Sequence, residues 1–218
     1  MSDGSLVREA IILAGGRGSR LAPWPAPKVL LPIAGVPILE RLLMHLVSQG
    51  IIRVIVCTGY RAKDVEAAVR WRAEPRAEIL FSNAGQDAAM GARLLRAKDL
   101  CGGGRLLVTY GDELADVDIE ALACAHASER ASITYTVWRH RLPFGVVVDG
   151  HIRDDEQVLI NIGFALVEPR AWPSLRPEDG LATWMNRENA RPYLHQGRRS
   201  TVNSLAELQS AEEVWRLS

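Results

Sequence analysis

Apolar segments of two kinds alternate along the first 130 residues. Short runs of continuous or β-branched apolar residues predict buried strands, and segments whose apolar residues recur every three or four positions predict helices. Strands are predicted at 9–14, 51–57, 78–81 and 105–110, and helices at 38–47, 62–72, within 85–98 and at 119–127. Strands that alternate with helices at these lengths predict a largely parallel α/β sheet.

The pattern changes after residue 130. Three predicted strands, at 133–138, 145–148 and 158–167, are separated only by short turns. We expect them to form an antiparallel or mixed addition to the same sheet. Because neither an internal repeat nor an inter-domain linker interrupts the chain, we expect one domain over residues 1–218.

Positive and negative charges balance in this chain of 218 residues, with 26 Lys and Arg against 26 Asp and Glu. The balance argues against a protein that coats nucleic acid or anionic membrane, because those partners select a basic excess. The three cysteines, Cys57, Cys101 and Cys124, are scattered and odd in number, so we expect no disulfide framework. The chain shows neither a signal segment nor 18 consecutive apolar residues, and we expect a cytoplasmic protein.

The first predicted strand runs into a glycine-rich loop, Leu13-Ala14-Gly15-Gly16-Arg17-Gly18-Ser19-Arg20-Leu21, which Pro27-Lys28 follows. Glycines at the end of a strand offer bare backbone N–H groups to an anion. Arg20 adds a planar fork for phosphate oxygens, and Lys28 adds a point charge. The loop therefore predicts a phosphate site; the alternative is a tight turn with solvated basic side chains. Its glycine spacing matches neither the dinucleotide-binding fingerprint nor the Walker A pattern.

Asp112 follows the predicted strand 105–110. A carboxylate at the C-terminal end of a parallel strand is well placed to hold a hard cation, and the alternative is an aspartate in a plain turn. Asp116 and Asp118, further along, are predicted as helix N-caps rather than as ligands.

The glycine-rich loop and Pro27-Lys28 together resemble the signature of the sugar-1-phosphate nucleotidyltransferases, L-A-G-G-x-G-T/S-R-L followed by P-K. Tyr110-Gly111-Asp112 is similar to the N/Y-G-D of the same family. Three further segments are similar to motifs of its glucose-1-phosphate cytidylyltransferase branch. The segment Met90–Leu94 is similar to the motif T-G-G-R-L, Phe144-Gly145 is similar to R-F-G, and Ile160–Phe164 is similar to I-N-G-G-F. In its short length, however, the chain resembles the heptose-1-phosphate guanylyltransferases.

The resemblance implies a single Rossmann-like three-layer domain of the nucleotidyltransferase type with a mostly parallel mixed sheet. Residues 1–130 would bind the nucleotide and residues 131–218 the sugar phosphate. Catalytic roles are implied for Arg20, Lys28 and Asp112, with Asp112 holding Mg²⁺. The residues implied to bind the nucleotide are Leu13, Ala14, Gly15, Gly16, Arg17, Gln86, Gly91 and Gly111. Those implied on the sugar-phosphate side are Gly145, Glu156, Asn161 and Gly163.

Two features depart from the family pattern. Asn203 stands where the family carries a second metal-holding Asp, and it offers the metal a carbonyl oxygen without charge. Ser204 and Glu207 have the spacing of a helix capping box, so a structural role for this segment is an alternative. The E-K-P motif, whose Lys contacts the sugar phosphate in the family, is missing. Glu156 is the candidate for its Glu, and Arg153 is the candidate for its cation.

We therefore expect an enzyme that transfers a nucleoside monophosphate from an NTP to a sugar 1-phosphate and releases pyrophosphate, with CTP as first choice and GTP as second. The base stays open, because Gln86 stands five residues before Gly91, as does a base-reading Gln of the thymidylyl branch. The alternative is a catalytically impaired, nucleotide-binding relative. The glycine spacing counts against a dinucleotide-binding oxidoreductase. A homo-oligomer is left open.

Overall fold

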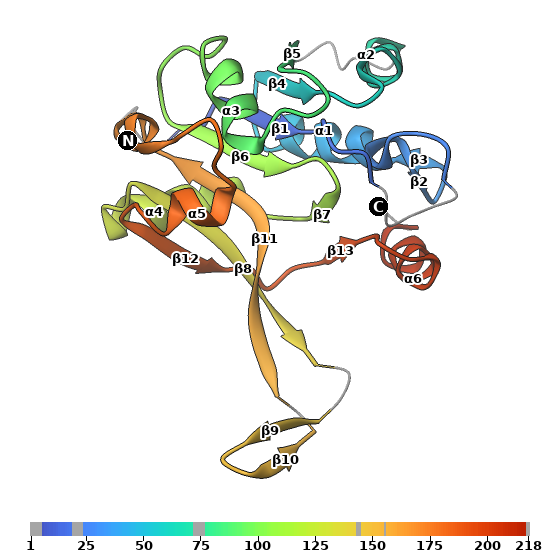
Figure 1. Ribbon diagram of the computed structural model, residues 1–218, viewed down its shortest axis with the longest axis vertical. Helices are drawn as coiled ribbons and strands as arrows, with labels where there is room; N and C mark the ends of the chain where they lie inside the picture. The colour runs from blue at the N-terminus through green and yellow to red at the C-terminus, as the bar shows by residue number, and fades with distance from the viewer. Residues whose placement is uncertain (1–5, 19–23, 72–76, 143–144, 155, 217–218) are drawn as a thin grey trace.

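The computed structural model describes residues 6–18, 24–71, 77–142, 145–154 and 156–216. Its centre is a seven-stranded sheet with the order β12-β8-β11-β6-β1-β4-β5 (Figure 1). The strands are β1 (Glu9–Leu13), β4 (Arg53–Thr58), β5 (Glu78–Asn83), β6 (Leu106–Tyr110), β8 (Ile133–Arg141), β11 (Gln157–Val167) and β12 (Ala190–Leu194). β5, β4, β1 and β6 are parallel, β11 is antiparallel to both of its neighbours, and β12 is parallel to β8. The predicted α/β class with a mostly parallel mixed sheet is confirmed.

Helices cover both faces of this sheet and make three layers. Those in the described residues are α1 (Ile38–Ser48), α2 (Ala62–Trp71), α3 (Met90–Lys98), α4 (Ile119–Glu129), α5 (Leu181–Met185) and α6 (Leu205–Trp215), with 3₁₀ turns η3 (Lys28–Leu30) and η4 (Pro169–Ser174). Side chains alternate across a strand, so Ile12 and Ile11 of β1 enter different apolar clusters. Ile12 packs with residues of α1 and α6, and Ile11 packs with residues of α3 and α5. None of the described helices is long and apolar enough to cross a membrane.

β8 and β11 continue past the sheet as an arm, whose tip is the hairpin of β9 (Val146–Val148) and β10 (His151–Arg153) (Figure 1). The prediction that residues 145–148 add to the central sheet is wrong, because β9 pairs with β10 instead. Asp149 and Gly150 between them have φ of 51° and 77°. This left-handed conformation at both central positions is that of a two-residue hairpin turn, so the chain folds straight back.

A short pairing brings a distant segment to the end of β6, where β7 (Glu113–Ala115) pairs with β13 (Arg199–Thr201). A local pairing joins β2 (Pro32–Ile33) and β3 (Val36–Pro37). β13 leads into α6, where Ser204 accepts a hydrogen bond from the N–H of Glu207, so the predicted N-cap is confirmed. The Glu207 carboxylate accepts from the N–H of Asn203 rather than from that of Ser204, so the second hydrogen bond of the capping box is shifted by one residue. Asp118 caps α4 as predicted. Asp116 does not, because its carboxylate accepts from Arg198 at 3.0 Å.

A buried polar cluster lies around His126, near the start of β6. The His126 ring lies 2.7 Å from the Thr134 hydroxyl and 2.9 Å from the Glu168 carboxylate, to which Arg105 also donates. Burial lowers the pKa of His126 below its ordinary 6.5; the hydrogen bond to Glu168 opposes the shift, and the charges of Arg105 and Arg170 add to it. His126 is therefore neutral at neutral pH.

We expect acid to destabilise the fold through His126. Below about pH 6.5 the unfolded chain takes up a proton that the folded chain resists, so the free energy of unfolding falls by up to about 1.4 kcal/mol per pH unit until the folded pKa is reached. Thermal melts at several pH values check this, with His126→Gln as a variant that keeps hydrogen-bonding groups but cannot titrate. If the Tm of both proteins fell equally with acid, His126 would not be the cause.

Candidate active site

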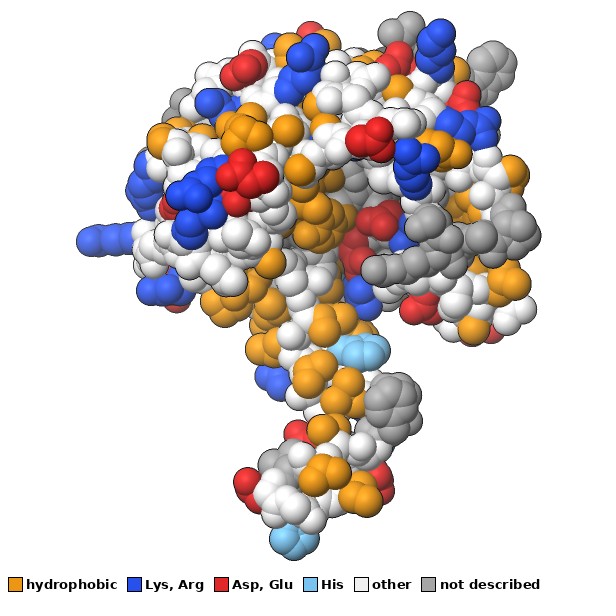
Figure 2. Space-filling model, in the orientation of Figure 1, with side chains coloured by type: hydrophobic (Ala, Val, Ile, Leu, Met, Phe, Trp, Pro, Cys, Tyr) orange, Lys and Arg blue, Asp and Glu red, His pale blue; other side chains and the backbone are white. Residues whose placement is uncertain are grey.

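The glycine-rich loop forms one wall of a cleft of about 720 Å³ at the C-terminal ends of β1 and β6. The carbonyl of Gly15 accepts a hydrogen bond from the N–H of Tyr60, which fixes the start of the loop. Gly18 has a φ of 68°, and a β-carbon there would lie 2.5 Å from the β-carbon of Lys28. Only glycine therefore lets the loop close onto Lys28. Figure 2 shows acidic and basic side chains together in a hollow between the arm and the rest of the molecule.

Most residues predicted for the nucleotide and for catalysis line this cleft. They are Leu13, Gly15, Gly16, Arg17, Lys28, Gln86 and Asp112. Ala14, Gly91 and Gly111 are not lining residues; a β-carbon at Gly91 would lie 2.0 Å from the carbonyl oxygen of Arg176, so this glycine lets α3 approach that backbone. Arg20 lies outside the described residues, and its predicted role is untested.

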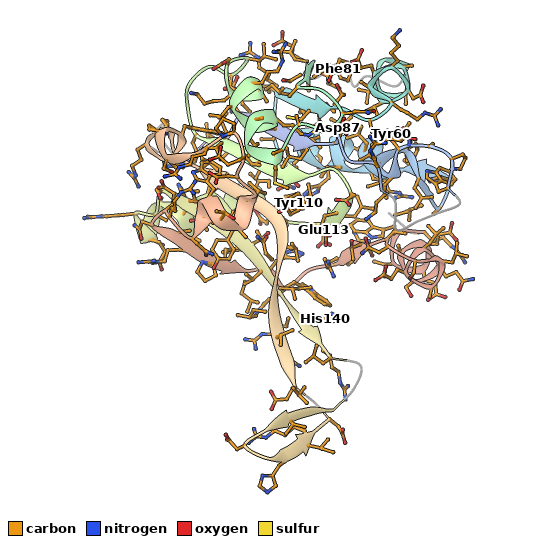
Figure 3. All side chains as sticks on the ribbon, in the orientation of Figure 1. Tyr60, Phe81, Asp87, Tyr110, Glu113 and His140 are labelled. Carbon is orange, nitrogen blue, oxygen red and sulfur yellow. The ribbon has the colours of Figure 1, made fainter. Side chains whose placement is uncertain are left out.

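Arg17 crosses the mouth of the cleft. Its guanidinium donates to the carboxylate of Asp87 at 3.1 Å and lies 5.3 Å from the ring centre of Tyr60. Figure 3 shows Tyr60 and Asp87 near each other, on the far side of Tyr110 from the arm. Arg17 and Asp87 are both exposed, and such ion pairs contribute little energy. A phosphate in the cleft can therefore compete for Arg17.

Lys28 joins the two predicted metal ligands. Its Nζ lies 2.9 Å from Oδ2 of Asp112 and 3.0 Å from Oδ1 of Asn203, although Asn203 is 175 residues away in the sequence. The side chain of Lys28 is almost fully buried, so the ammonium is held at one point. The N–H of Gly111 donates to the carbonyl of Leu13 at 3.0 Å and so holds the turn that carries Asp112. Two oxygens and one cation therefore meet at the point where Lys28 and Asp112 line the cleft, and Asn203 reaches Lys28 without lining the cleft itself.

Asp112 and Asn203 also have the chemistry to hold a Mg²⁺ ion that is shared with a substrate. The point on which they converge holds the Lys28 ammonium, so the ion would bind to oxygen lone pairs that Lys28 leaves open; both side chains offer the hard oxygen donors that Mg²⁺ prefers. Across the described ranges no three His, Cys, Asp or Glu side chains form a metal site of their own. Mg²⁺ is usually held by one or two carboxylates with phosphates and waters. The donor set therefore suits an ion that arrives with a nucleotide.

Arg93 is a cleft residue that sequence reasoning missed. Its guanidinium is buried, and it donates to the carbonyls of Thr58, Gln86 and Ala88 at 2.7, 3.0 and 3.1 Å. A β-carbon at Gly15 would lie 1.9 Å from this guanidinium, so the glycine makes room for it. Burial lowers the pKa of Arg93. The signal was present in the Met90 to Leu94 segment, where Arg93 matches the R of T-G-G-R-L.

Replacement of Arg93 by Met should weaken both the fold and nucleotide binding. Three carbonyls would lose their donor, at about 1–3 kcal/mol for each one left buried and unpaired. Because two of those carbonyls belong to the wall at Gln86 and Ala88, we expect the NTP KM to rise at least about tenfold. Arg96→Met, at an exposed position of the same helix, is the matched control. Equal NTP KM values in the two variants would contradict this role.

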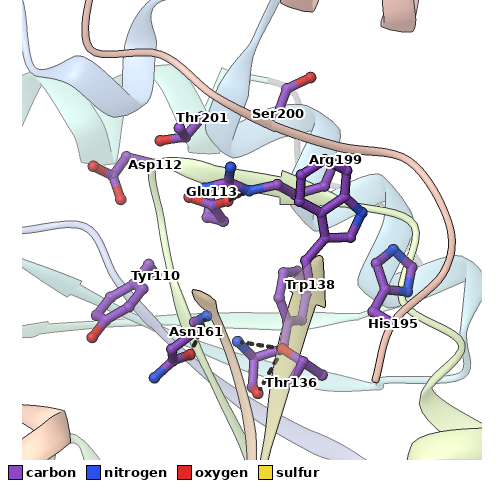
Figure 4. A network of polar contacts seen from close by, with 12 residues as sticks. Tyr110, Asp112, Glu113, Thr136, Trp138, Asn161, His195, Arg199, Ser200 and Thr201 are labelled. Atoms are coloured by element: carbon purple, nitrogen blue, oxygen red, sulfur yellow. Dashed lines mark hydrogen bonds and ion pairs between the residues drawn. The ribbon is translucent and has the colours of Figure 1, made fainter. Parts of the chain in front are cut away.

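Tyr110, Asn161 and Gly163 lie together beside Asp112 (Figure 4). The side-chain oxygen of Asn161 accepts a hydrogen bond from the N–H of Gly163 at 2.8 Å. This contact lies where the pairing of β11 with β8 shifts register. Gly163 has a φ of 78°, and a β-carbon there would lie 2.0 Å from the ring of Tyr110. Since Tyr110 lines the cleft, the structure brings the predicted Asn161 and Gly163 to its edge.

Gly145 and Glu156 lie in the arm instead. A β-carbon at Gly145 would touch Ile152 of β10, and the Glu156 carboxylate lies 3.4 Å from Arg153. Figure 1 shows this hairpin at the tip of the arm, away from β6 and β7. The structure therefore does not bring Gly145, Glu156 or Arg153 together with Asp112, and their sugar-phosphate roles stay predictions.

Glu113 and Arg199 form a buried ion pair next to Asp112. The Nε–H of Arg199 donates to Oε1 of Glu113, and the guanidinium lies 5.8 Å from the ring centre of Trp138. Burial raises the pKa of Glu113 to about 7, against the opposing charge of Arg199. Neither residue belongs to a sequence motif from which a role could be predicted.

The model of the MobA-like NTP transferase domain matches residues 10–217. The chain belongs to this family. The resemblance to sugar-1-phosphate nucleotidyltransferases is confirmed, since the curated relatives of this MobA-like chain include several of them.

Two of these relatives and one solved structure illustrate the similarity. The chain is 26% identical to the probable glucose-1-phosphate cytidylyltransferase of Bacillus subtilis over 95% of its own length and 96% of the relative's. It is 31% identical to the mannose-1-phosphate guanylyltransferase of Mycobacterium tuberculosis over 60% of its own length and 37% of the relative's. Its fold matches that of HddC from Yersinia pseudotuberculosis complexed with GMP-PN, with a TM-score of 0.76, 19% identity and coverage of 95% and 99% of the two chains.

Proposed function

We propose that this MobA-like protein transfers a nucleoside monophosphate from an NTP to a sugar 1-phosphate and releases pyrophosphate. One observation carries the proposal. Oxygens of Asp112 and Asn203 lie within 3.0 Å of the Lys28 Nζ, and Lys28 and Asp112 line a cleft whose wall is a glycine-rich loop. Cations beside backbone N–H groups suit phosphates, and the adjacent carboxylate suits the divalent ion that accompanies them.

The chemistry is an in-line displacement at the α-phosphorus. A phosphate oxygen of the acceptor forms a bond to that phosphorus, the bond to the bridging oxygen of the β-phosphate breaks, and the electron pair leaves with pyrophosphate. Such transfers depend on positioning and on stabilisation of charge, so a covalent enzyme intermediate is not needed.

The residues of the cleft divide this work. The backbone N–H groups of the loop face the nucleotide phosphates, and Arg17 exchanges its exposed Asp87 partner for one of them. Lys28 uses two of its three N–H donors on Asp112 and Asn203, which leaves the third for a phosphate oxygen. Asp112 and Asn203 would hold Mg²⁺, which neutralises charge on the phosphates when it is bound.

CTP is the first choice of nucleotide and GTP the second. The cytidylyltransferase relative aligns over nearly the whole chain, whereas the guanylyltransferase relative aligns over 60% of it. Gln86 lines the cleft, which supports a role for it in reading the base. The names of the relatives differ in the base, so the nucleotide is to be decided by assay.

The test measures pyrophosphate release with each of the four NTPs, Mg²⁺ and a panel of sugar 1-phosphates. We expect release with one NTP well above the other three, and only when both an acceptor and Mg²⁺ are present. Silence of every combination, with a protein that still binds an NTP, would rule out the proposal.

A second candidate function is that of a nucleotide-binding relative without turnover. Such a protein would release no pyrophosphate with any combination of substrates. The observation in its favour is Asn203, because one of the two oxygens at the cation position carries no charge. Calorimetric titration with the same NTPs separates the two candidates, since both bind nucleotide and only the enzyme consumes it.

A further inference from the structure

A sugar 1-phosphate that enters the cleft needs a cation for its phosphate, and two candidates among the described residues are already engaged elsewhere. Arg153, the sequence-based candidate, is exposed in β10 and paired with Glu156 in the arm. Lys28 is already held by Asp112 and Asn203 on the floor of the cleft. A different cation is therefore needed to meet the acceptor.

Arg199 is a cation held in place beside Asp112. The register of β13 with β7 sets Thr201 opposite Glu113, and the Glu113 carboxylate accepts from the Nε–H of Arg199. The Arg199 side chain is 13% exposed and lies against Trp138, so few other positions are open to it. Figure 4 shows Asp112 and Arg199 on either side of Glu113.

The two terminal nitrogens of Arg199 remain available. The Glu113 carboxylate takes the Nε–H, and no other described residue accepts a hydrogen bond from this guanidinium. Two parallel N–H donors on one guanidinium match two oxygens of a phosphate. The Glu113 contact thus orients Arg199 without occupying the edge that binds an anion.

The position of Arg199 matches the side from which the acceptor must come. Tyr110 and Asp112 line the nucleotide cleft, whereas Glu113 and Arg199 do not, and Figure 4 shows Arg199 on the side of Glu113 away from Asp112. In an in-line displacement the attacking phosphate stands opposite the leaving pyrophosphate. With the pyrophosphate on the loop, the attacking phosphate stands on the Arg199 side. We propose that Arg199 binds the phosphate of the sugar 1-phosphate, an inference that rests on the proposed transfer reaction.

The test compares the effects of Arg199→Ala on the two substrates. The acceptor KM should rise about 10- to 100-fold, the usual range for loss of a charge-assisted hydrogen bond, while the NTP KM stays within about twofold. Arg199→Lys, which keeps the charge but not the paired donors, should fall between wild type and Arg199→Ala. Arg198→Ala is the matched control, because Arg198 lies against Trp215 and pairs with Asp116 instead; it should change neither KM.

Binding measurements keep this test independent of turnover. Calorimetric titration with glucose 1-phosphate and mannose 1-phosphate should show binding to wild type that Arg199→Ala weakens by the same factor, even if no pyrophosphate is released. If the Arg199→Ala variant is unfolded, the same titrations with Arg199→Lys test whether Arg199 contributes to sugar-phosphate affinity. An unchanged acceptor affinity, an equal loss of NTP affinity, or a wild type that binds neither sugar phosphate would overturn the role of Arg199. Silence of the pyrophosphate assay alone would overturn the transfer reaction and not this binding role.

Discussion

Replacement of Asp112 by Asn should lower kcat by roughly 10³-fold, the upper range for loss of one electrostatic group that stabilises a transition state. The amide keeps the shape of the carboxylate and can still accept from Lys28, whose Nζ lies 2.9 Å away. It removes the charge that would hold Mg²⁺ among the nucleotide phosphates. Because the Asp112 side chain is 43% exposed, the fold should tolerate the change.

Steady-state assays over a range of Mg²⁺ concentrations measure this effect, with thermal melts to show that the variant is folded. Asn203→Asp is the complementary variant, since it restores a second carboxylate 3.0 Å from Lys28. We expect it to lower the Mg²⁺ concentration needed for half-maximal rate. An Asp112→Asn protein within about tenfold of wild-type kcat would show that the metal assignment is wrong.

Lys28→Met should lower kcat/KM for the NTP by roughly 10²- to 10³-fold. Methionine fills a similar volume in the buried slot but brings no ammonium to the phosphates. Asp112 and Asn203 would then lose the partner that holds both oxygens in one place. Since both groups are lost together, we expect this variant to impair binding as well as turnover.

The assay for Lys28→Met separates NTP binding, by calorimetry, from the rate of pyrophosphate release. Lys28→Arg is the matched control for charge, and we expect it to remain impaired, because a planar guanidinium does not fit a slot that holds a compact ammonium. Full activity in Lys28→Arg with loss in Lys28→Met would mean that charge alone matters. Full activity in both variants would show that Lys28 has no role in NTP binding or turnover.

Much of the fold could be predicted from local patterns. The helix from Ile38 is amphipathic, and the buried strands at β1, β4 and β6 are apolar and short, so period and length suffice. The segments after Val167 could not be predicted in this way. β12 contains Arg191 and Pro192, and β13 is three residues long; both are strands because a neighbour pairs with them, which local sequence does not report.

The nucleotide side of the cleft was more predictable than the acceptor side, where only Asn161 and Gly163 of the predicted residues reach the edge of the cleft. The glycine-rich loop, Lys28 and Asp112 belong to short motifs whose residue types reveal their chemistry. The contact of Lys28 with Asn203 depends on the pairing of β13 with β7, which brings these two residues together although 175 positions separate them in the sequence. Arg199 has no motif around it, and only its contacts with Glu113 and Trp138 distinguish it from Arg198 beside it.

The fate of the α-phosphorus tests nucleotidyl transfer at this site most directly. Wild-type protein is incubated with Mg²⁺, a sugar 1-phosphate and CTP or GTP labelled with ³²P at the α-position, and the products are separated by chromatography. We predict label in a phosphatase-resistant nucleoside diphosphate sugar, none in the protein, and almost none in any product of Asp112→Asn. Label that stays in the NTP with every acceptor, or that becomes attached to the protein, would contradict direct transfer.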